Sequence, residues 1–193
     1  MDPKPLLDCF KKYISLTNEE ELLLLSKVTY RKYLKSQYIV QQGDICKFTG
    51  FIISGCTKTF YMDDGGQEHI ILFAIEDWWT SDLGSFIAQS PADFNVQCIE
   101  NTELIQFSFD AIEELFIEIP KLERFFRKIV ERAFVSTQKR IVRNFSLTAK
   151  EQYVQFKNMY PTIEQRVPQY MIASYLGITK EFLSKIKSQL LLE

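Results

Sequence analysis

The residues best suited to chemistry lie near the C-terminus, where polar side chains gather around one short helical segment. In chain order they are Gln169, Thr179, Lys180, Glu181, Ser184, Lys185 and Lys187. Lysine donates to the acceptors of guanine, glutamate accepts from the amino group of cytosine, and serine or threonine can hold a phosphate. These residue types at the start of one helix predict a surface that reads double-stranded DNA in the major groove.

Two short helical patterns around a glycine are expected to position this cluster. Pro168 suits the first position of one helix, and Gly177 can take the left-handed conformation that ends it. Thr179 is expected to cap the second helix. The side of that helix expected to be buried carries Phe182, Leu183 and Ile186. Residues 168–190 are therefore predicted to form a helix-turn-helix, with a helical hairpin that binds nothing as the alternative.

Charge is distributed unevenly along the 193 residues, although the net charge is only −2. Residues 121–190 contain 14 Lys and Arg against 5 Asp and Glu, whereas residues 1–120 contain 9 against 19. A basic C-terminal third on an acidic body is typical of a chain in which one part meets a polyanion. A solvated basic helix surface is the alternative explanation.

The sequence offers little for catalysis. The four cysteines, Cys9, Cys46, Cys56 and Cys98, lack the paired spacing of a zinc or iron–sulfur site, so reduced and mostly buried thiols are expected. The single histidine, His69, is expected to be a partly solvated structural residue. No nucleophile with a base, no phosphate-binding glycine loop and no metal-ligand spacing is found, so we expect neither an enzyme nor a cofactor.

The sequence shows neither a secretory leader nor a membrane-spanning segment. The first residues lack a basic leader followed by an apolar core, and the apolar run at residues 70–75 is too short to cross a bilayer. A cytoplasmic protein without membrane contact is expected.

The sequence ahead of the polar cluster shows two patterns, one helical and one typical of strands. The first thirty residues are predicted to be helical, with a capping box formed by Thr17 and Glu20. Short segments rich in Ile, Phe, Tyr and Thr between Val28 and Phe109 predict antiparallel strands in a sandwich or barrel. Gly65 and Gly66 are the strongest hairpin signal, followed by a strand over residues 70–75.

A long helix is predicted to begin at Pro120. Apolar residues recur along it at three- and four-residue steps from Leu122 to Phe145. The opposite face is expected to carry Arg124, Arg127, Lys128, Arg132, Lys139 and Arg140. The apolar stripe is wider than one neighbouring sheet requires, so a homodimer is expected, with a helix buried within one chain as the alternative.

The long helix is expected to break near residues 146–148, because Thr148 and Glu151 have the spacing of a second capping box. A hinge between domains is expected at this break. The next helix should run until Pro161 and Thr162. Basic residues on and after it that could support DNA phosphates are Lys150, Lys157 and Arg166.

An acidic strand-rich part, a long helix and this helix-turn-helix together resemble the Crp/Fnr family of bacterial transcription regulators, over nearly the whole chain. The segment 173–185 also resembles the subgroup found in Bacteroidetes. The resemblance implies an α+β fold: an N-terminal jelly-roll sensor of the cyclic nucleotide-binding type over residues 1–109, a helical connector with the dimerisation helix over 110–147, and a DNA-binding domain over 148–193. It further implies a palindromic operator, with Lys180, Glu181 and Lys185 at base-contacting positions.

The sequence departs from this family where its nucleotide-binding members carry a phosphate cassette. The residues of this degenerate ligand pocket are Asp82, Leu83, Gly84, Ala92 and Asp93. An arginine should stand beside them to offset a cyclic phosphate, whereas Asp93 would repel one. Control by cyclic AMP in the usual way is therefore not expected. Asp82 could accept from a ribose hydroxyl or cap the local backbone, and the aromatic residues around Trp78 and Trp79 are expected to form core.

The sequence thus predicts a sequence-specific DNA-binding transcription regulator. The alternative is a small-molecule-sensing module that acts through protein contacts and whose helix-turn-helix reads no DNA. An unidentified small-molecule effector and RNA polymerase are further expected partners, whereas the operator, the regulated genes and the direction of regulation are not encoded in any pattern found.

Overall fold

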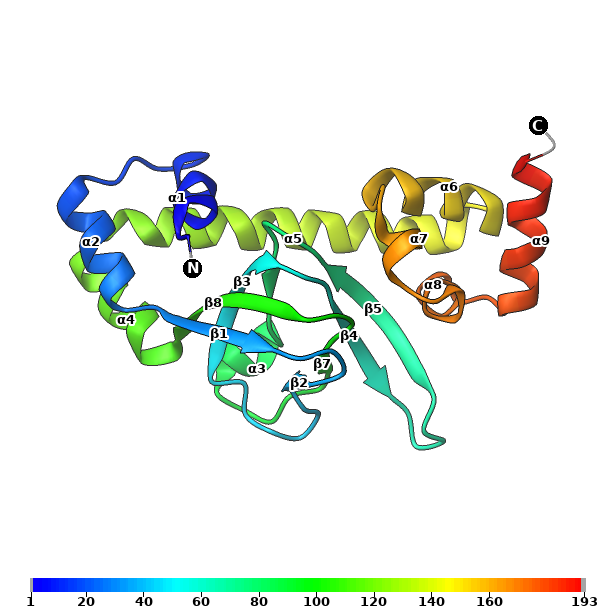
Figure 1. Ribbon diagram of the computed structural model, residues 1–193, viewed down its shortest axis with the longest axis horizontal. Helices are drawn as coiled ribbons and strands as arrows, with labels where there is room; N and C mark the ends of the chain where they lie inside the picture. Colours follow the sequence, from blue (N-terminus) through cyan, green and yellow to red (C-terminus); the bar gives the residue numbers. More distant parts are fainter. Residues whose placement is uncertain (1, 192–193) are drawn as a thin grey trace.

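A computed structural model describes residues 2–191 (Figure 1). The N-terminal part contains α1 (Lys4–Lys11), α2 (Asn18–Ser26), β1 (Thr29–Tyr33), β2 (Tyr38–Val40), β3 (Phe48–Ser54), β4 (Thr57–Met62), β5 (Glu68–Ala74), β6 (Trp79–Thr80), α3 (Leu83–Ala88), β7 (Asn95–Cys98) and β8 (Thr102–Ser108). The helices that follow are α4 (Phe109–Glu118), α5 (Lys121–Ser146), α6 (Ala149–Met159), α7 (Ile163–Arg166), α8 (Gln169–Leu176) and α9 (Lys180–Leu191). This α+β layout confirms the predicted fold class.

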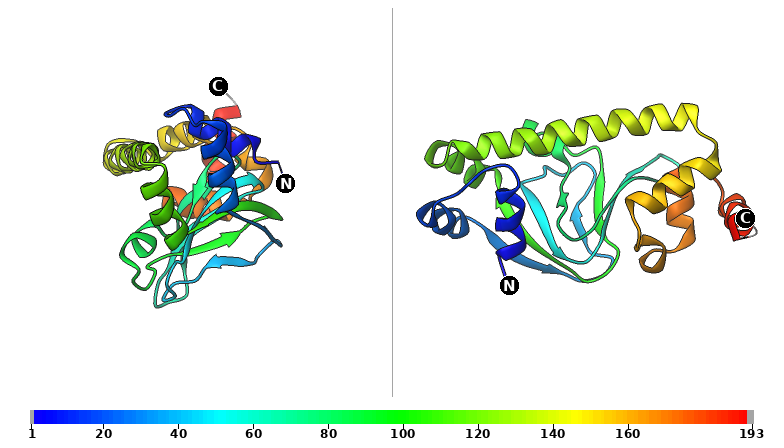
Figure 2. Two further views of the ribbon diagram at one scale, coloured as in Figure 1. Left: turned by 90° about the vertical axis from the view of Figure 1, so that its left-hand side faces the viewer. Right: turned by 90° about the horizontal axis from the view of Figure 1, so that it is seen from above.

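The strands form a sandwich of two antiparallel sheets, with strand orders β1-β8-β3-β6 and β2-β7-β4-β5. Side chains on neighbouring residues of a strand point to opposite faces, so each sheet has an inner face toward the other sheet and an outer face. We call the sheets the first and the second in that order. Different helices lie beside the two sheets: α5 runs along one side of the sandwich, and α6–α9 gather beside β5 (Figures 1 and 2).

The outer face of the first sheet packs against helices α1 and α5. Phe51 and Ile105 are paired across β3 and β8 and are both fully buried. The rings of Trp79 and Phe10 lie 6.3 Å apart, and those of Trp79 and Phe125 lie 6.0 Å apart, so α1, β6 and the start of α5 share one core. This confirms Trp79 as a core residue.

The helical lead-in consists of two helices separated by a non-helical segment. The predicted capping box at the start of α2 is confirmed: Glu20 N–H donates to Thr17 Oγ1 at 3.3 Å, and Thr17 N–H donates to Glu20 Oε2 at 2.6 Å. The expectation that the first thirty residues are helical throughout is wrong, because residues 12–17 connect α1 to α2 without helical structure.

The predicted hairpin joins β4 to β5. Asp63 Oδ1 accepts from the backbone N–H groups of Gly65 and Gln67, each at 2.9 Å, and closes the turn. Gly66 has a φ of 79°, the region that glycine tolerates at low cost. The strand after the turn begins at Glu68 rather than at residue 70.

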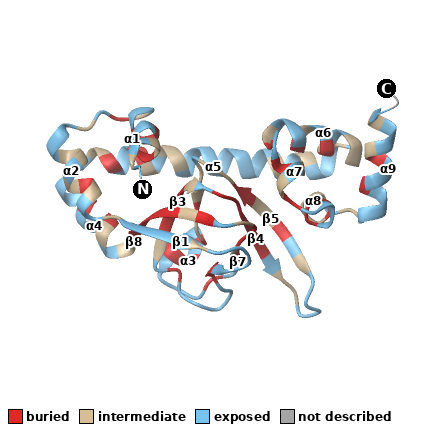
Figure 3. Cartoon of the chain, in the orientation of Figure 1, coloured by how far each residue is buried: buried red, intermediate tan, exposed pale blue. Residues whose placement is uncertain are grey.

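Helix α5 follows Pro120 as predicted and runs along the whole molecule (Figure 2, right). Its N-terminal part is anchored in the core by Leu122 and Phe125, whereas its later part is largely exposed (Figure 3). The predicted break is confirmed, because α5 ends at Ser146 and a capping box between Thr148 and Glu151 starts α6. A role for the break as a hinge stays a prediction.

The helices α6–α9, which we call the C-terminal helical unit, gather at one end of α5 beside β5 (Figure 1). They pack against β5, which forms one edge of the second sheet, and against Phe60 of the neighbouring strand β4. A single cluster of buried apolar residues joins the two parts. Its members on the sandwich are Cys56, Phe60, Ile70, Phe73 and Ile99, and its members on the unit include Tyr153, Phe156, Tyr160, Met171, Ile172 and Leu183. Helices α1 and α5 therefore pack on the first sheet, and the C-terminal helical unit packs on the β5 side of the second sheet.

Within residues 2–191, no helix is long and apolar enough to cross a membrane.

Candidate nucleic-acid interface and sensor surface

Helices α8 and α9 form the predicted helix-turn-helix. Gly177, with a φ of 67°, ends α8, and Ile178 N–H donates to Ala173 O at 3.0 Å across the turn. Thr179 Oγ1 accepts from Phe182 N–H at 3.2 Å, which confirms Thr179 as the cap of the second helix. Pro168 was expected inside the first helix, but its extended ψ of 147° places it before the helix, which begins at Gln169.

The exposed side of α9 carries most of the predicted reading residues. Leu183 and Ile186 are buried against α8 and the rest of the unit. The side chains left exposed are Gln169, Thr179, Lys180, Glu181, Ser184 and Lys185. Phe182 was expected to be buried and is 49% exposed. The reason is geometric: Leu183 occupies the centre of the buried face, and Phe182, one position earlier, is rotated about 100° away from it.

Two basic residues of the predicted nucleic-acid surface are instead paired with carboxylates. Lys187 Nζ lies 3.0 Å from Glu164 Oε1, within the C-terminal helical unit. Arg166 was expected to support phosphates, but its guanidinium is bidentate to Glu76 at 2.8 and 2.9 Å and also binds Glu100, so a contact with DNA stays a prediction. The sequence gives no signal for these pairs, because Glu76 and Glu100 lie 90 and 66 residues away.

The other two basic residues expected to support phosphates lie on α6. The ammonium of Lys157 sits over the ring of Tyr153, 5.8 Å from its centroid. Lys150 is half-buried in the first turn of α6. Their contact with DNA stays a prediction.

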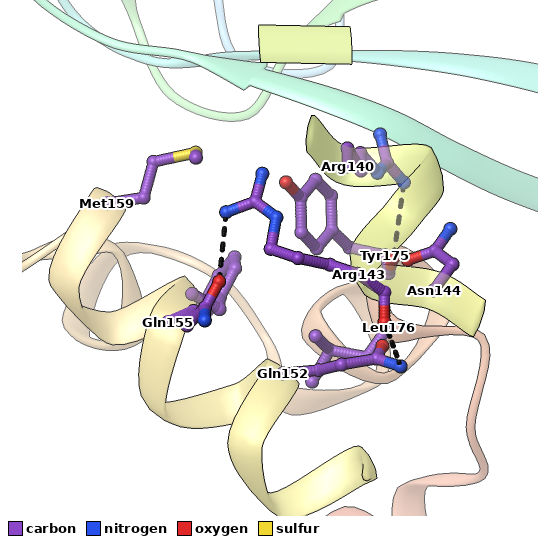
Figure 4. A pocket seen from close by; sticks show the side chains of 9 residues that line it. Arg140, Arg143, Asn144, Gln152, Gln155, Met159, Tyr175 and Leu176 are labelled. Carbon is purple, nitrogen blue, oxygen red and sulfur yellow. Dashed lines mark hydrogen bonds between the residues drawn. The ribbon is translucent and has the colours of Figure 1, made fainter. Parts of the chain in front are cut away.

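Arg140 also departs from its predicted place. It was expected on the solvent face of the long helix, but its guanidinium binds the backbone oxygens of Ile71 and Tyr175 and stacks 4.2 Å from the centroid of the Tyr175 ring. It therefore bridges β5 and α8. Figure 4 shows the Arg140 side chain close to Tyr175.

Helix α8 contacts β5 directly through Ser174. The Ser174 hydroxyl donates to Glu68 O at 2.8 Å and accepts from Ile70 N–H at 3.1 Å, so it occupies part of the free edge of β5. An open groove of about 470 Å³ adjoins this contact. Its lining residues are Gln67, Glu68, Tyr170, Ala173, Ser174, Ile178 and Lys180. One predicted reading residue, Lys180, therefore lies at the border between the helix-turn-helix and the β4–β5 hairpin.

The degenerate ligand pocket is built around a structural aspartate. Asp82 is 3% exposed and accepts from Ser85 N–H and Phe94 N–H, each at 3.0 Å. It thus caps α3 and links the helix to the following loop. Of the two expected roles, the structure shows the capping of the local backbone. Leu83, Gly84 and Asp93 are exposed and Ala92 is buried. Residues 59–120 contain no Lys or Arg and 13 Asp and Glu, so this part of the sequence supplies no cation for a phosphate.

Two further hollows lie outside the cassette. An open groove of about 700 Å³ runs along β1 and β2, with Arg31, Tyr33, Tyr38, Lys47 and Gln106 among its lining residues. A cavity of about 30 Å³ lies where α5 meets α6 and α8, and Arg143 donates to Gln155 Oε1 beside it at 3.2 Å (Figure 4). The small cavity has room for a water molecule or two, not for a nucleotide.

The thiols and the histidine match their expected structural roles. Cys9, Cys46, Cys56 and Cys98 are all free and buried. Burial raises the pKa of the Cys56 thiol to about 12 and shifts the pKa of the other three upward. His69 is half-exposed and pairs with Asp63 at 2.7 Å across the hairpin. No group of three His, Cys, Asp or Glu side chains within residues 2–191 is arranged to hold a metal ion.

Comparison with known proteins agrees with this geometry. Residues 30–118 match the family model described as the cyclic nucleotide-binding domain. The transcriptional activator protein Anr of Pseudomonas protegens is 24% identical over 88% of this chain and 74% of its own length. The anaerobic regulatory protein of Haemophilus influenzae is 26% identical over 88% of this chain and 70% of its own length.

Solved structures share the fold at lower identity. The c-di-GMP responsive global regulator CLP of Xanthomonas campestris has a TM-score of 0.72 at 16% identity, covering 91% of this chain and 92% of its own. FixK2 of Bradyrhizobium japonicum has a TM-score of 0.73 at 15% identity, covering 84% of each chain.

The structure combines a strand sandwich that matches the cyclic nucleotide-binding domain with a long helix and a helix-turn-helix. Its overall fold is that of the two solved structures. The chain is similar in sequence and in fold to these regulators. Membership of the Crp/Fnr family, and of its Bacteroidetes subgroup, stays a prediction.

Proposed function

We propose that the chain is a sequence-specific DNA-binding transcription regulator, in which residues 148–193 form the DNA-binding domain and residues 1–109 the sensor. The observation that carries the proposal is the division of α9 into a buried side and an exposed polar side. Lys180, Ser184 and Lys185 are exposed near its N-terminal end, where recognition helices meet base edges. The curated relatives are named as transcriptional activators or regulatory proteins, which supports the same function.

The proposed DNA contacts divide into two roles. Lys180, Glu181 and Lys185 are proposed to contact bases, where a good bidentate contact discriminates by about 1–3 kcal/mol. The residues proposed to contact phosphates or to support the register are Gln169, Thr179, Ser184 and Lys187. Because Lys187 is already paired with Glu164, its contribution to DNA affinity should be the smallest among the lysines of α9.

The proposed partner of α5 is a second copy of this chain. Its exposed apolar residues include Phe134, Val135, Ile141, Val142 and Phe145. Phe134, Ile141 and Phe145 follow one another at steps of seven and four residues, as the a and d positions that form the seam of a parallel coiled coil do. Such a dimer would present two reading heads to a palindromic operator with half-sites about 34–36 Å apart.

Regulation by cyclic AMP is not part of the proposal. The absence of Lys and Arg from residues 59–120, and the engagement of Asp82 with two backbone N–H groups, leave the cassette region without a partner for a cyclic phosphate. RNA polymerase and an effector other than cyclic AMP stay predicted partners. A cytoplasmic location also stays a prediction.

The test is selection of bound duplexes from a random DNA pool by the full chain, with and without cyclic AMP. We expect an enriched palindrome that is independent of cyclic AMP. Lys185→Ala and Lys180→Ala should relax the preference at individual base pairs, whereas Lys4→Ala, an exposed lysine on α1, is the matched control and should leave it unchanged. No enriched sequence under either condition would favour the protein-interaction module instead.

A further inference from the structure

The contact between the second sheet and the C-terminal helical unit is built like a protein core. The rings of Phe73 on β5 and Tyr160 after α6 lie 5.9 Å apart, those of Phe73 and Tyr175 on α8 lie 5.6 Å apart, and those of Trp78 and Tyr160 lie 5.5 Å apart. Phe73 and Tyr160 are at most 1% exposed. Such packing resists sliding, because close-packed side chains have few alternative arrangements.

Two arginines close this contact at its edges, and both cross from one part of the chain to the other. Arg166 on α7 reaches Glu76, which follows β5, and Glu100, which lies between β7 and β8. Its side chain is 19% exposed, so the pairs are shielded from solvent more than ordinary surface pairs. Arg140 on α5 binds backbone oxygens of β5 and α8 together.

The geometry of the Arg166 contact is specific to a guanidinium. Its two terminal nitrogens face both oxygens of Glu76, and one of them also binds Glu100. A lysine has one charged nitrogen and cannot reproduce this fork. Glu76 is also held from within the sandwich by Gly55 N–H, which donates to its Oε1 at 2.9 Å.

We infer that Arg166 and Arg140 are positioning residues, which fix the helix-turn-helix on the β5 side of the second sheet and thereby set the distance between the two reading heads of a dimer. This inference rests on the proposed DNA-binding function for its second half and on contacts within one chain for its first half. The long helix fixes where the C-terminal helical unit starts, and the two arginines fix how it is turned.

The first half is tested by hydrogen exchange on the full chain, with Arg166→Gln, Arg140→Gln and Arg127→Gln compared with the natural sequence. Arg127 is the matched control, because its pair with Glu131 lies within α5. We expect exchange in β5 and α8, which includes the Ile70 N–H bound to Ser174, to become at least tenfold faster in the first two variants. Exchange in β8 and α1 should stay unchanged, which separates undocking from general unfolding. Unchanged exchange in β5 and α8 would overturn the inference.

Arg166→Lys distinguishes positioning from simple charge balance. It keeps the charge but loses the fork, so exchange in β5 should lie between the values for the natural sequence and for Arg166→Gln. Full recovery by lysine would show that charge alone holds the unit, and would overturn the positioning role of the guanidinium.

The second half is tested by DNA selection with half-sites at varied spacing. The natural sequence should select one spacing, and Arg166→Gln should accept several with the same bases within each half-site. A single unchanged spacing despite faster exchange would overturn the link to the reading heads. If the natural sequence bound no DNA at all, the proposed function would fail while the exchange experiment would still decide whether the arginines position the unit.

Discussion

Tyr160 lies in the contact between the strand sandwich and the C-terminal helical unit, where its ring is packed but its hydroxyl is not hydrogen-bonded to any residue that the structure describes. Its ring contacts Phe73, Trp78, Phe156 and Tyr175. Its hydroxyl is buried without a hydrogen-bond partner among the described residues, and burial raises its pKa. A buried polar group without a partner costs free energy that an apolar group of the same shape does not.

Tyr160→Phe should therefore leave the free energy of unfolding unchanged or raise it by up to about 1 kcal/mol. Urea unfolding monitored by circular dichroism measures this difference. Phe156→Ala, which removes a neighbouring buried ring, should lower the free energy of unfolding by about 3–5 kcal/mol and serves as the control. A loss above about 1 kcal/mol in Tyr160→Phe would mean that the hydroxyl is bonded after all.

At the scale of single elements, the end of α8 and the exposed face of α5 depend on different residues. The end of α8 depends on Gly177, whose positive φ is costly for other residues although no atom lies within 4 Å of an added Cβ. The later part of α5 carries the apolar residues of the proposed dimer interface, of which Phe145 is 87% exposed and Phe134 is 62% exposed. Apolar side chains gathered along one exposed helix typically mark an interface.

Gly177→Ala should lower the free energy of unfolding by about 1 kcal/mol, through backbone strain and not through a clash. Gly177→Asn should lose less, because asparagine tolerates the left-handed region better than alanine does. Thermal unfolding of the two variants side by side is the measurement, and equal losses would argue against backbone conformation as the cause.

Phe134→Glu combined with Phe145→Glu should convert the proposed dimer to a monomer without unfolding it, because two charges would be buried at the seam. Sedimentation velocity gives the mass in solution. Ile117→Glu replaces an equally exposed apolar residue on α4, 78% exposed, and should leave the mass unchanged. A dimer that survives the double substitution would place the interface elsewhere.

At the scale of the whole molecule, the acidic sandwich and the basic C-terminal helical unit meet through charged groups as well as apolar ones. Burial raises the pKa of the Glu76 carboxyl, but hydrogen bonds from Arg166 and from Gly55 N–H outweigh it and hold the pKa below its ordinary value. The same contact raises the pKa of Arg166, through Glu76 and then Glu100.

This shift predicts how docking responds to pH. A carboxyl whose pKa is lowered on folding stabilises the folded state above its unfolded pKa of about 4.3, and that stabilisation is lost as the pH falls through the lowered value. The contact should therefore hold at pH 7 and weaken below about pH 4. Hydrogen exchange in β5 measured from pH 6 to pH 3, after correction for intrinsic rates, checks this.

Glu76→Gln provides the comparison, since it removes the titrating group but keeps its shape. Exchange in β5 should already be faster at pH 6 in this variant and should change less with pH than in the natural sequence. Parallel pH profiles for the two proteins would assign the acid response to other carboxylates.

The sequence by itself determined the elements whose signals are local. The capping boxes at Thr17 and Thr148, the turn at Gly66 and the end of α8 at Gly177 each depend on residues within a few positions. The apolar spacing along α9 likewise predicted Leu183 and Ile186 as buried, and was wrong for Phe182, since spacing alone does not fix how a helix is rotated against its support.

What only the tertiary structure decided was the use of residues whose partners are distant in sequence. Arg140 and Arg166 are of the residue type that a DNA-facing surface uses, yet 66 to 90 residues separate them from the atoms they bind on the strand sandwich. A charged side chain carries no local mark of its partner, because an ion pair depends on distance in space and on burial. The sequence therefore shows that these residues are basic and predicts that they lie on helices. Which atoms they bind is determined by the packing of the C-terminal helical unit on the second sheet.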